Sequence, residues 1–169
     1  MVRLMIDYGT LSIVLTGIGI IGAIVYYTLT LRNATKTRQA QLFIQIYNRF
    51  NTREFVEQMN YLRFKWSIPQ LEDWREFFTS EEYQEDFNIV ASTVYFFEGV
   101  GVLVSKGLID VELVDDLMSG PLTHIWERML PFNDSARAVL GQPAAEWYEF
   151  LYNKVKPIRE KQHLEQSDP

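Results

Sequence analysis

The sequence predicts an all-α protein in which one N-terminal transmembrane helix is followed by a compact helical-bundle domain. Three observations lead to this fold class. Residues 8–31 form 24 consecutive positions without a charged side chain. In the rest of the chain the apolar residues recur at spacings of three and four, which is the period of an amphipathic helix. No segment alternates apolar and polar residues as a half-buried strand does.

The uncharged stretch is long enough to cross a bilayer, because about 20 apolar residues in a helix span about 30 Å of hydrocarbon. Tyr8 and the pair Tyr26–Tyr27 lie near its two ends, and tyrosine favours the membrane–water interface. A cleaved signal peptide has a shorter apolar region and a cleavage site of small residues, whereas this stretch ends in Leu31-Arg32-Asn33. We therefore expect an uncleaved membrane anchor rather than a signal peptide or a buried core helix.

Positive charge follows the stretch on its C-terminal side. Arg32, Lys36 and Arg38 form a basic collar, and such residues stay on the cytoplasmic side. The predicted protein is a single-pass protein of the cell (inner) membrane. Its expected parts are a short external N-terminus (1–7), the transmembrane helix (8–31), a cytoplasmic helical domain (32–157) and a flexible polar tail (158–169).

Small residues lie along one face of the predicted anchor. Ser12, Thr16, Gly19 and Ala23 follow one another at spacings of four, three and four. Such a strip lets two helices approach closely in lipid, so a homodimer through these residues stays open beside the ordinary glycine content of a membrane helix. A pore built from several anchors is disfavoured, because the stretch has no charged residue to line a channel.

Charge divides unevenly beyond the anchor. Residues 32–65 carry a net charge of +5, whereas residues 66–169 hold eight cations and 19 carboxylates, a net charge of −11. A basic segment beside the anchor suits attraction to anionic headgroups. The acidic remainder argues against nucleic-acid binding, which needs a cationic surface. The expected partners are therefore the lipid bilayer and an unknown protein, with no nucleic acid.

Capping signals and apolar spacing divide the first half of the domain into helices. A stripe over 37–50 continues from the anchor, and Asn51–Glu54 and Thr79–Glu82 are typical of capping boxes that open the helices after them. Residues 71–78 form a short helix candidate. The most apolar segment, 87–104, is predicted to be the central helix of a bundle rather than a second membrane span, because its central glutamate would cost about 2.5–3.5 kcal/mol in a bilayer.

Glycines and prolines set the expected boundaries in the second half. Gly107 is predicted to end one helix in the left-handed conformation, and Asp110 to cap a short helix over 111–119. Gly120-Pro121 then starts another helix, since proline suits the first helical position. The remaining expectations are that this helix bends or breaks at Pro131 and resumes towards Leu140, and that a last helix opens at Pro143 and ends near Pro157.

Glu98 is the single weak catalytic candidate, and no stronger one is found. A carboxylate in the middle of the apolar segment needs a partner or has a chemical role. The expected partner is an arginine, a tryptophan indole or a free helix terminus, with Arg128, Arg137 and Trp126 as named choices. A structural role is favoured, because nothing nearby in the sequence supplies a nucleophile or a second acid.

The two histidines do not predict a metal site. His124 precedes Glu127 by three residues, and His163 follows Glu160 by three. A di-iron bundle site needs two Glu-x-x-His pairs and two further glutamates, of which this sequence offers one pair. The sequence has no phosphate-loop, serine-elbow or zinc-protease signature. The dinucleotide-binding pattern matches only inside the predicted membrane helix, where it has no strand before it. The sequence therefore predicts neither a metal nor a cofactor.

A set of ordered motifs resembles an uncharacterised family. The motifs are Phe96-Phe97-Glu98-x-x-Gly101-x-Leu103, Gly107-Leu108-Ile109-Asp110, Trp126 and Tyr148-Glu149-Phe150-Leu151, within residues 36–155. Members look like small prokaryotic all-helical proteins, many with one N-terminal membrane helix, classed as a domain of unknown function. The resemblance implies a helical domain without assigned activity or catalytic residues. The motif residues are taken to be Phe96, Phe97, Glu98, Gly101, Leu103, Gly107, Asp110, Trp126, Arg137, Glu149 and Leu151.

These observations favour a membrane-anchored cytoplasmic domain that acts as a protein-interaction or regulatory module, rather than an enzyme. The motivation is one anchor, a basic collar, an acidic helical body and no catalytic set. The alternative is a membrane-surface enzyme that uses Glu98 as a general acid or base in a pocket between helices.

Overall fold

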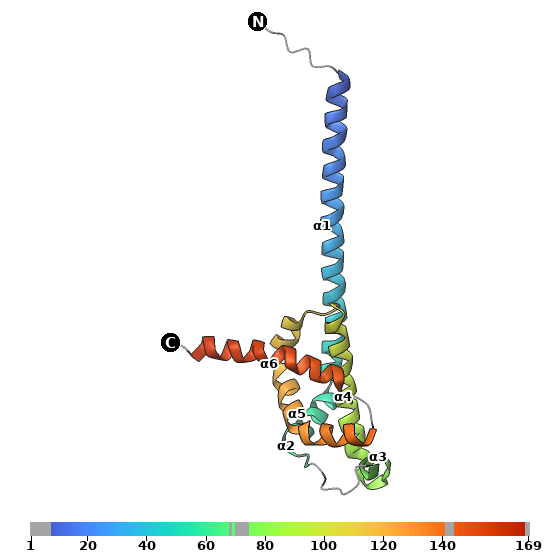
Figure 1. Ribbon diagram of the computed structural model, residues 1–169, viewed down its shortest axis with the longest axis vertical. Helices are drawn as coiled ribbons and strands as arrows, with labels where there is room; N and C mark the ends of the chain where they lie inside the picture. Colours follow the sequence, from blue (N-terminus) through green and yellow to red (C-terminus); the bar gives the residue numbers. More distant parts are fainter. Residues whose placement is uncertain (1–7, 68, 70–74, 141–143, 168–169) are drawn as a thin grey trace. The chain divides into compact units, whose positions relative to one another are not determined.

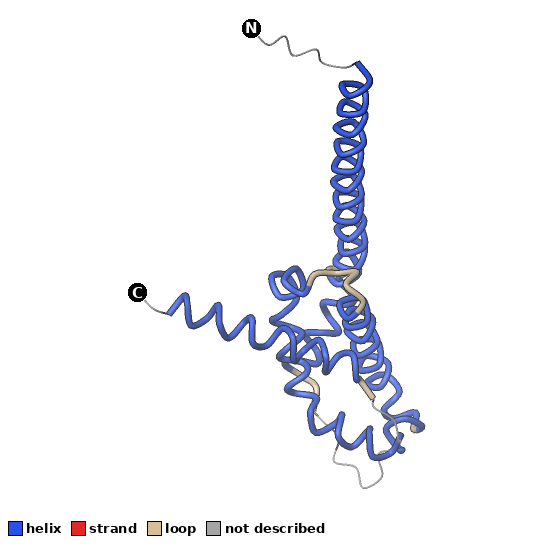
Figure 2. The backbone as a smooth tube through the Cα atoms, turned by 45° about the horizontal axis from the view of Figure 1, so that its top comes forward, coloured by secondary structure: helices blue, strands red, loops and turns tan. Residues whose placement is uncertain are grey.

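The computed structural model describes residues 8–67, 69, 75–140 and 144–167, and these are helical almost throughout (Figure 1). Within these ranges there are six α-helices, one short 3₁₀ helix and no strand (Figure 2). The all-α prediction is confirmed. The predicted external N-terminus, Pro143 at the start of the last helix and the first part of the short helix over 71–78 lie outside the described residues.

Contacts within the chain divide the protein into two units, Met1–Gln41 and Leu42–Pro169. The bounds are α1 Tyr8–Phe50, α2 Arg53–Phe64, α3 Arg75–Thr79, η1 Glu81–Tyr83, α4 Gln84–Ser105, α5 Val111–Leu140 and α6 Glu146–Ser167.

The described part of the first unit is a single helix, the stretch of α1 that reaches Gln41, and it is apolar up to Leu31. Its large side chains are exposed, with Ile13 at 75% and Tyr26 at 73% of their full accessible surface. Thr16 and Thr28 donate their hydroxyl protons to carbonyls four residues earlier, both at 2.8 Å. A helix in lipid has to satisfy polar groups internally in this way.

Two helical segments are long and apolar enough to cross a membrane by length and composition, Leu11–Phe50 and Glu81–Ser105. The apolar window of the first is not buried at all, whereas 28% of the second is buried inside the protein. The second contains α4, whose Val90, Phe97 and Val100 belong to the core. The prediction of a long apolar N-terminal helix followed by a helical bundle is therefore confirmed.

The core of the second unit lies between α2, α4, α5 and α6. Helices α4 and α5 both pack against α6, and α2 packs against both α4 and α5. Each large apolar side chain that is fully buried contributes about 1.5–3 kcal/mol to folding. The largest fully buried side chains are Trp66, Trp126, Tyr148, Phe55, Phe77, Phe97, Leu62, Met118, Leu122, Ile125, Met129 and Leu151.

Side-chain caps open two of the helical segments. The Thr52 hydroxyl oxygen accepts a hydrogen bond from the Phe55 amide at 3.3 Å, and the Ser80 hydroxyl oxygen accepts one from the Glu82 amide at 3.2 Å. The sequence placed both capping boxes one residue too early. Asn51 still donates its amide to the last turn of α1, so the cap falls on the next residue.

The turn between α4 and α5 follows the prediction. Gly107 has a φ of +66°, and its amide donates to the Val104 carbonyl at 2.9 Å. The Leu108 amide reaches back to the Leu103 carbonyl, also at 2.9 Å, which completes a Schellman cap. Asp110 accepts the Glu112 amide at 3.1 Å and caps α5.

The predicted helix boundary at Gly120-Pro121 is wrong, because α5 is one helix of 30 residues with Pro121 and Pro131 inside it. A proline removes one backbone donor and bends a helix without always ending it. The ribbon of α5 changes direction along its course (Figure 1). Buried side chains on both sides of the first proline, Met118 and Leu122, are seated in the core and favour continuity.

The last helix also passes a proline. The sequence placed its end near Pro157, whereas α6 continues through Pro157 to Ser167. Pro157 is exposed, while Leu151 and Val155 are fully buried on the other face. The buried face anchors the helix before the proline, so the missing backbone donor does not terminate it.

Candidate functional site

Glu98 joins two helices that are far apart in the sequence. It lies on α4, half-buried, and its Oε1 accepts a hydrogen bond from the Tyr148 amide at 2.7 Å. Tyr148 is in the first turn of α6, where backbone amides have no partner within their own helix. A carboxylate also interacts favourably with the positive end of the helix dipole. Glu98 thus binds a helix terminus, the third of the three kinds of partner considered from the sequence.

The α4 backbone touches α6 one turn further on, at Gly101. A Cβ atom built at this glycine would lie 2.1 Å from the Trp147 carbonyl oxygen and 2.7 Å from its carbonyl carbon. No side chain fits at such a distance. At Gly99, on the same helix, a Cβ would meet nothing within 4 Å. Close approach of the two backbones therefore requires glycine at 101 and not at 99.

Tyr148 is the centre of an aromatic cluster behind this contact. Its ring stacks on Phe97 at 4.7 Å between centroids and meets the edge of Trp126 at 4.8 Å. Its hydroxyl donates to the Leu122 carbonyl at 2.8 Å. Burial raises the pKa of Tyr148 well above its ordinary value, so the hydroxyl stays a neutral donor.

Arg137 holds the same junction from the end of α5. Its Nη2 forms an ion pair with Glu149, and its Nε donates to the Ala144 carbonyl at 3.1 Å. Ala145, the next residue, has a φ of +60°, a left-handed conformation that an alanine rarely adopts. The contacts on either side hold this backbone in place. We call the residues that seat the start of α6 the α6 junction; they are Phe97, Glu98, Gly101, Trp126, Arg137, Tyr148 and Glu149.

The other motif residues lie apart from this junction. Phe96 packs on the Phe55 ring at 4.6 Å between centroids, and Leu103, Gly107 and Asp110 shape the turn between α4 and α5. Leu151 is fully buried on α6. The motif therefore marks two structural positions, a helix docking site and a helix turn.

The residues proposed for the membrane lie in the first unit. Arg32, Lys36 and Arg38 are exposed on α1. The strip Ser12, Thr16, Gly19 and Ala23 is exposed as well, and a Cβ at Gly19 would meet nothing within 4 Å. Both sets are accessible for contact with lipid or a second helix.

A cleft of about 540 Å³ opens beside Glu98. Asn133 is buried on its wall, and its side-chain nitrogen has no hydrogen-bond partner. Glu98 is the single carboxylate among the described lining residues, which include no serine, cysteine, histidine or lysine. The lining is Phe78, Phe87, Val90, Ala91, Val94, Tyr95, Glu98, Phe132, Asn133, Ala136, Ala144 and Ala145.

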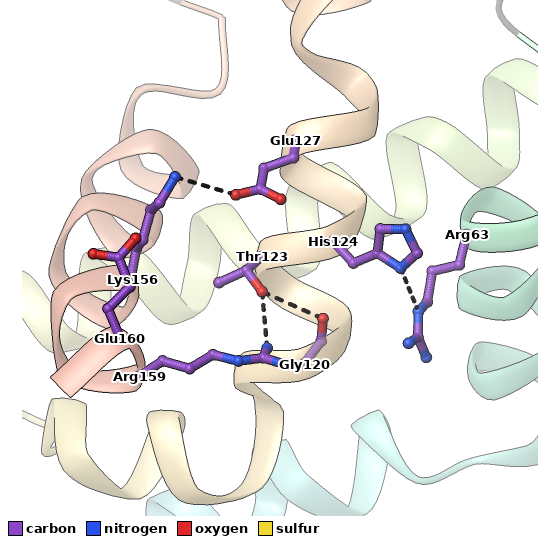
Figure 3. Close-up of a pocket in the computed structure, with 8 residues that line it drawn as sticks. All are labelled: Arg63, Gly120, Thr123, His124, Glu127, Lys156, Arg159 and Glu160. Atoms are coloured by element: carbon purple, nitrogen blue, oxygen red, sulfur yellow. Dashed lines mark hydrogen bonds and ion pairs between the residues drawn. The ribbon is translucent and has the colours of Figure 1, made fainter. Parts of the chain in front are cut away.

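A second hollow, the polar pocket, lies between α2, α5 and α6 and has a volume of about 350 Å³ (Figure 3). Helix α2 contributes one residue, and α5 and α6 contribute the rest. Three cations and two carboxylates face it together with a histidine. The lining residues are Arg63, Gly120, Thr123, His124, Glu127, Lys156, Arg159 and Glu160.

Hydrogen bonds order one side of the polar pocket. The Glu127 carboxylate accepts from the Tyr152 hydroxyl at 2.8 Å and from the Lys156 ammonium at 3.3 Å. The Tyr152 hydroxyl accepts from the same ammonium at 2.8 Å. The hydrogen bonds from Tyr152 and Lys156 lower the pKa of Glu127, so its side chain stays a charged carboxylate. Its negative charge is balanced by the Lys156 ammonium in the pocket wall.

Sequence reasoning missed this pocket. It considered only His124 with Glu127 and Glu160 with His163, as metal-ligand pairs, and the side chain of His163 lies outside the described part. The available signal was a polar stripe at spacings of three and four in α5 and again in α6. Which stripes face each other depends on how the helices pack.

A third hollow, the acidic groove, lies along α2, η1 and the start of α4 and has a volume of about 850 Å³. None of its described lining residues is a lysine or arginine. The Tyr61 hydroxyl donates to the Asp86 carboxylate at 2.7 Å, which raises the pKa of Tyr61 to about 12. The lining is Glu54, Glu57, Gln58, Tyr61, Glu81, Gln84, Glu85, Asp86, Asn88 and Ile89.

Fold and motif together define an all-helical domain that follows a long apolar helix. The chain belongs to the family described as Domain of unknown function (DUF4760), whose profile matches residues 13–162. The resemblance seen in the motifs is thereby confirmed for the family and its helical fold. No curated protein and no solved structure matches the chain.

Gly101→Ala and Gly99→Ala form a matched pair that tests the α6 junction. Gly101→Ala forces α4 and α6 apart and should lower the free energy of unfolding by about 3 kcal/mol. Gly99→Ala has free space and should raise it by about 0.5–1 kcal/mol, because alanine favours the helix. Denaturant unfolding of the full chain in detergent, followed by circular dichroism, measures both. Equal effects would contradict the backbone contact.

Glu98→Ala and Glu98→Gln separate a capping role from a catalytic one. Alanine leaves the Tyr148 amide without its acceptor and should lower the free energy of unfolding by about 1.5–3 kcal/mol. Glutamine keeps an acceptor oxygen without the charge, so about 1 kcal/mol should be lost. Loss of a biochemical activity in Glu98→Gln with unchanged stability would instead support proton-transfer chemistry at this residue.

Proposed function

We propose that the chain is a single-pass, membrane-anchored helical domain that acts as a protein-interaction or regulatory module on the cytoplasmic side of the cell membrane. The observation that carries the proposal is the exposure of the apolar part of α1. No residue in its apolar window is buried inside the protein. A lipid environment suits such an exposed apolar surface.

The energetic case rests on the size of this surface. Ile18, Ile20, Ile21 and Ile24 are each between 56% and 64% exposed. Full burial of one such side chain is favourable by about 1.5–3 kcal/mol. A water-soluble protein rarely exposes a continuous surface of this kind, which marks a membrane or protein contact. The length of the helix favours the membrane, since about 20 apolar residues suffice to cross it.

Orientation follows from the charges next to the anchor. Arg32, Lys36 and Arg38 lie directly after it, and their exposed side chains suit anionic headgroups of the cytoplasmic leaflet. In the proposed orientation, Leu42–Pro169 lie on the cytoplasmic side. A homodimer through Ser12, Thr16, Gly19 and Ala23 is compatible with the exposure of that strip.

The acidic groove supports the interaction role. Its described lining has no lysine or arginine and five carboxylates, which are Glu54, Glu57, Glu81, Glu85 and Asp86. One of them, Glu57, pairs with Arg53 at 2.8 Å on the outer face of α2. Electrostatic complementarity then favours a protein partner with a lysine- or arginine-rich segment.

The alternative, a membrane-surface enzyme that uses Glu98, is less well supported. The cleft beside Glu98 gives room for a small molecule. One carboxylate oxygen, however, already accepts the Tyr148 amide. The described lining of the cleft also supplies no second acid or nucleophile, which most general acid–base sites need.

Charges placed in the apolar part of α1 test the anchor. The double variant Ile20→Lys/Ile24→Lys should leave the carbonate-resistant membrane fraction, because each lysine costs about 2.5–3.5 kcal/mol near the centre of a membrane helix. The control Asn33→Lys/Ala40→Lys adds the same charges to exposed positions of α1 beyond the apolar part and should stay in the membrane.

Two results would contradict the proposal, the first for the anchor and the second for its orientation. One is a wild-type chain that remains in the supernatant after ultracentrifugation. The other is a C-terminal tag that protease removes from intact cells, which would place the domain outside.

Charge removal tests the groove as the partner surface. A photo-crosslinking residue at Asn88, exposed on the groove, should capture a basic protein in cells. The adduct should fall about tenfold in Glu54→Gln/Glu81→Gln/Glu85→Gln, since several charge contacts of 0.5 kcal/mol or so are lost. The control Glu112→Gln/Asp116→Asn/Asp134→Asn removes as many exposed charges from α5. An equal loss in the control variant would show only a net-charge effect and would reject the groove.

A further inference from the structure

Two arginines approach the polar pocket from opposite sides of α5. Arg63 on α2 donates its Nε to Nδ1 of His124 at 3.3 Å, and Arg159 on α6 donates its Nη1 to the Thr123 hydroxyl at 3.0 Å (Figure 3). Adjacent residues of α5 thus position guanidinium groups from two different helices. Neither acceptor is a carboxylate, so neither arginine is paired with a negative charge through this contact.

The positions of both arginines are fixed by further contacts. The Arg63 guanidinium lies 4.8 Å from the centroid of the Phe64 ring, a cation–π distance. The Thr123 hydroxyl that accepts from Arg159 donates its own proton to the Ser119 carbonyl at 2.8 Å. The side chains are therefore held before any ligand arrives, which lowers the entropy cost of binding.

The other charged residues of the pocket do not fully offset the positive charge of these two arginines. Lys156 and Glu127 form an ion pair with each other at 3.3 Å. Glu160 is exposed, and no described cation forms an ion pair with it. The described lining residues therefore have a formal excess of one positive charge when His124 is counted as neutral. This occurs in a region, 66–169, whose net charge is −11.

From this arrangement we propose that the polar pocket binds a phosphate-bearing ligand, with Arg63 and Arg159 as its charged contacts. Each guanidinium carries five donors in a planar fork that matches phosphate oxygens, and among the described residues one donor of each forms a hydrogen bond within the protein. A volume of about 350 Å³ admits a small phosphomonoester. Thr123 and His124 act as positioning residues.

The shared chemistry is a phosphate group, whose source is either a soluble metabolite or a lipid headgroup. The pocket is built wholly from residues of the second unit, so the proposal does not depend on the membrane anchor. It also differs from the acidic groove, which suits a ligand of opposite charge.

Binding of inorganic phosphate and glycerol 3-phosphate to the full chain in a neutral detergent tests the soluble source, with isothermal titration calorimetry as the measurement. Nanodiscs of phosphatidylcholine with and without phosphatidic acid test the lipid source, with protection of the pocket face from hydrogen exchange as the measurement. Saturable binding or specific protection in either arm supports the proposal. No effect in both arms overturns it.

Matched variants assign the binding to the pocket. Arg63→Gln and Arg159→Gln should each weaken the affinity about tenfold, since a charged hydrogen bond is lost. Arg53→Gln on α2 and Lys154→Gln on α6 remove equal charge from exposed positions outside the pocket and should change the affinity less than about twofold. Equal weakening by the pocket and control variants would show non-specific charge attraction and overturn the assignment.

A conservative variant keeps the test decisive if a glutamine variant fails to fold. Arg63→Lys preserves the charge but removes the planar fork, so the affinity should fall several-fold while the circular dichroism spectrum stays unchanged. An unchanged affinity in Arg63→Lys would contradict a guanidinium contact with the ligand.

Discussion

The docking of the first turn of α6 on α4 is the contact on which the rest of the bundle depends. Glu98 accepts the Tyr148 amide, and Gly101 leaves room for the Trp147 carbonyl. The amide at a helix start needs an acceptor, and the carboxylate provides one without water. Because α6 packs against both α4 and α5, a loss of this contact would uncover the buried faces of both helices.

This junction accounts for motif residues that are widely spaced in the sequence. Tyr148 contacts Phe97 of α4 and Trp126 of α5. Glu149 pairs with Arg137, which lies further along α5. The separation of 51 positions between Phe97 and Tyr148 closes when α6 packs against α4 and α5. These motif residues join helices through packing, a cap and an ion pair, which is a sufficient structural explanation for the motif. This explanation assigns no chemical activity to the family.

Local signals predicted the parts of the fold that depend on a few neighbouring residues. Gly107 and Asp110 were correct because a left-handed stop and an N-cap are decided within one turn of the chain. The helix boundaries expected at Gly120-Pro121 and near Pro157 were wrong. Buried side chains on both sides of Pro121, and on the helix before Pro157, outweigh the loss of one backbone donor. The polar pocket could not be predicted, since Arg63 and Arg159 meet α5 only after three helices have packed.

Glu98 cannot serve equally well as a cap and as a general acid. A general acid is protonated during part of its cycle, and protonation would remove the charge that strengthens its bond to the Tyr148 amide. The α6 start would then be held less firmly in each cycle. Arg159 lies 11 residues beyond Tyr148 on the same helix, about 16 Å along its axis. A displaced α6 would therefore carry Arg159 away from Thr123, so a firmly held Glu98 also keeps the polar pocket in place.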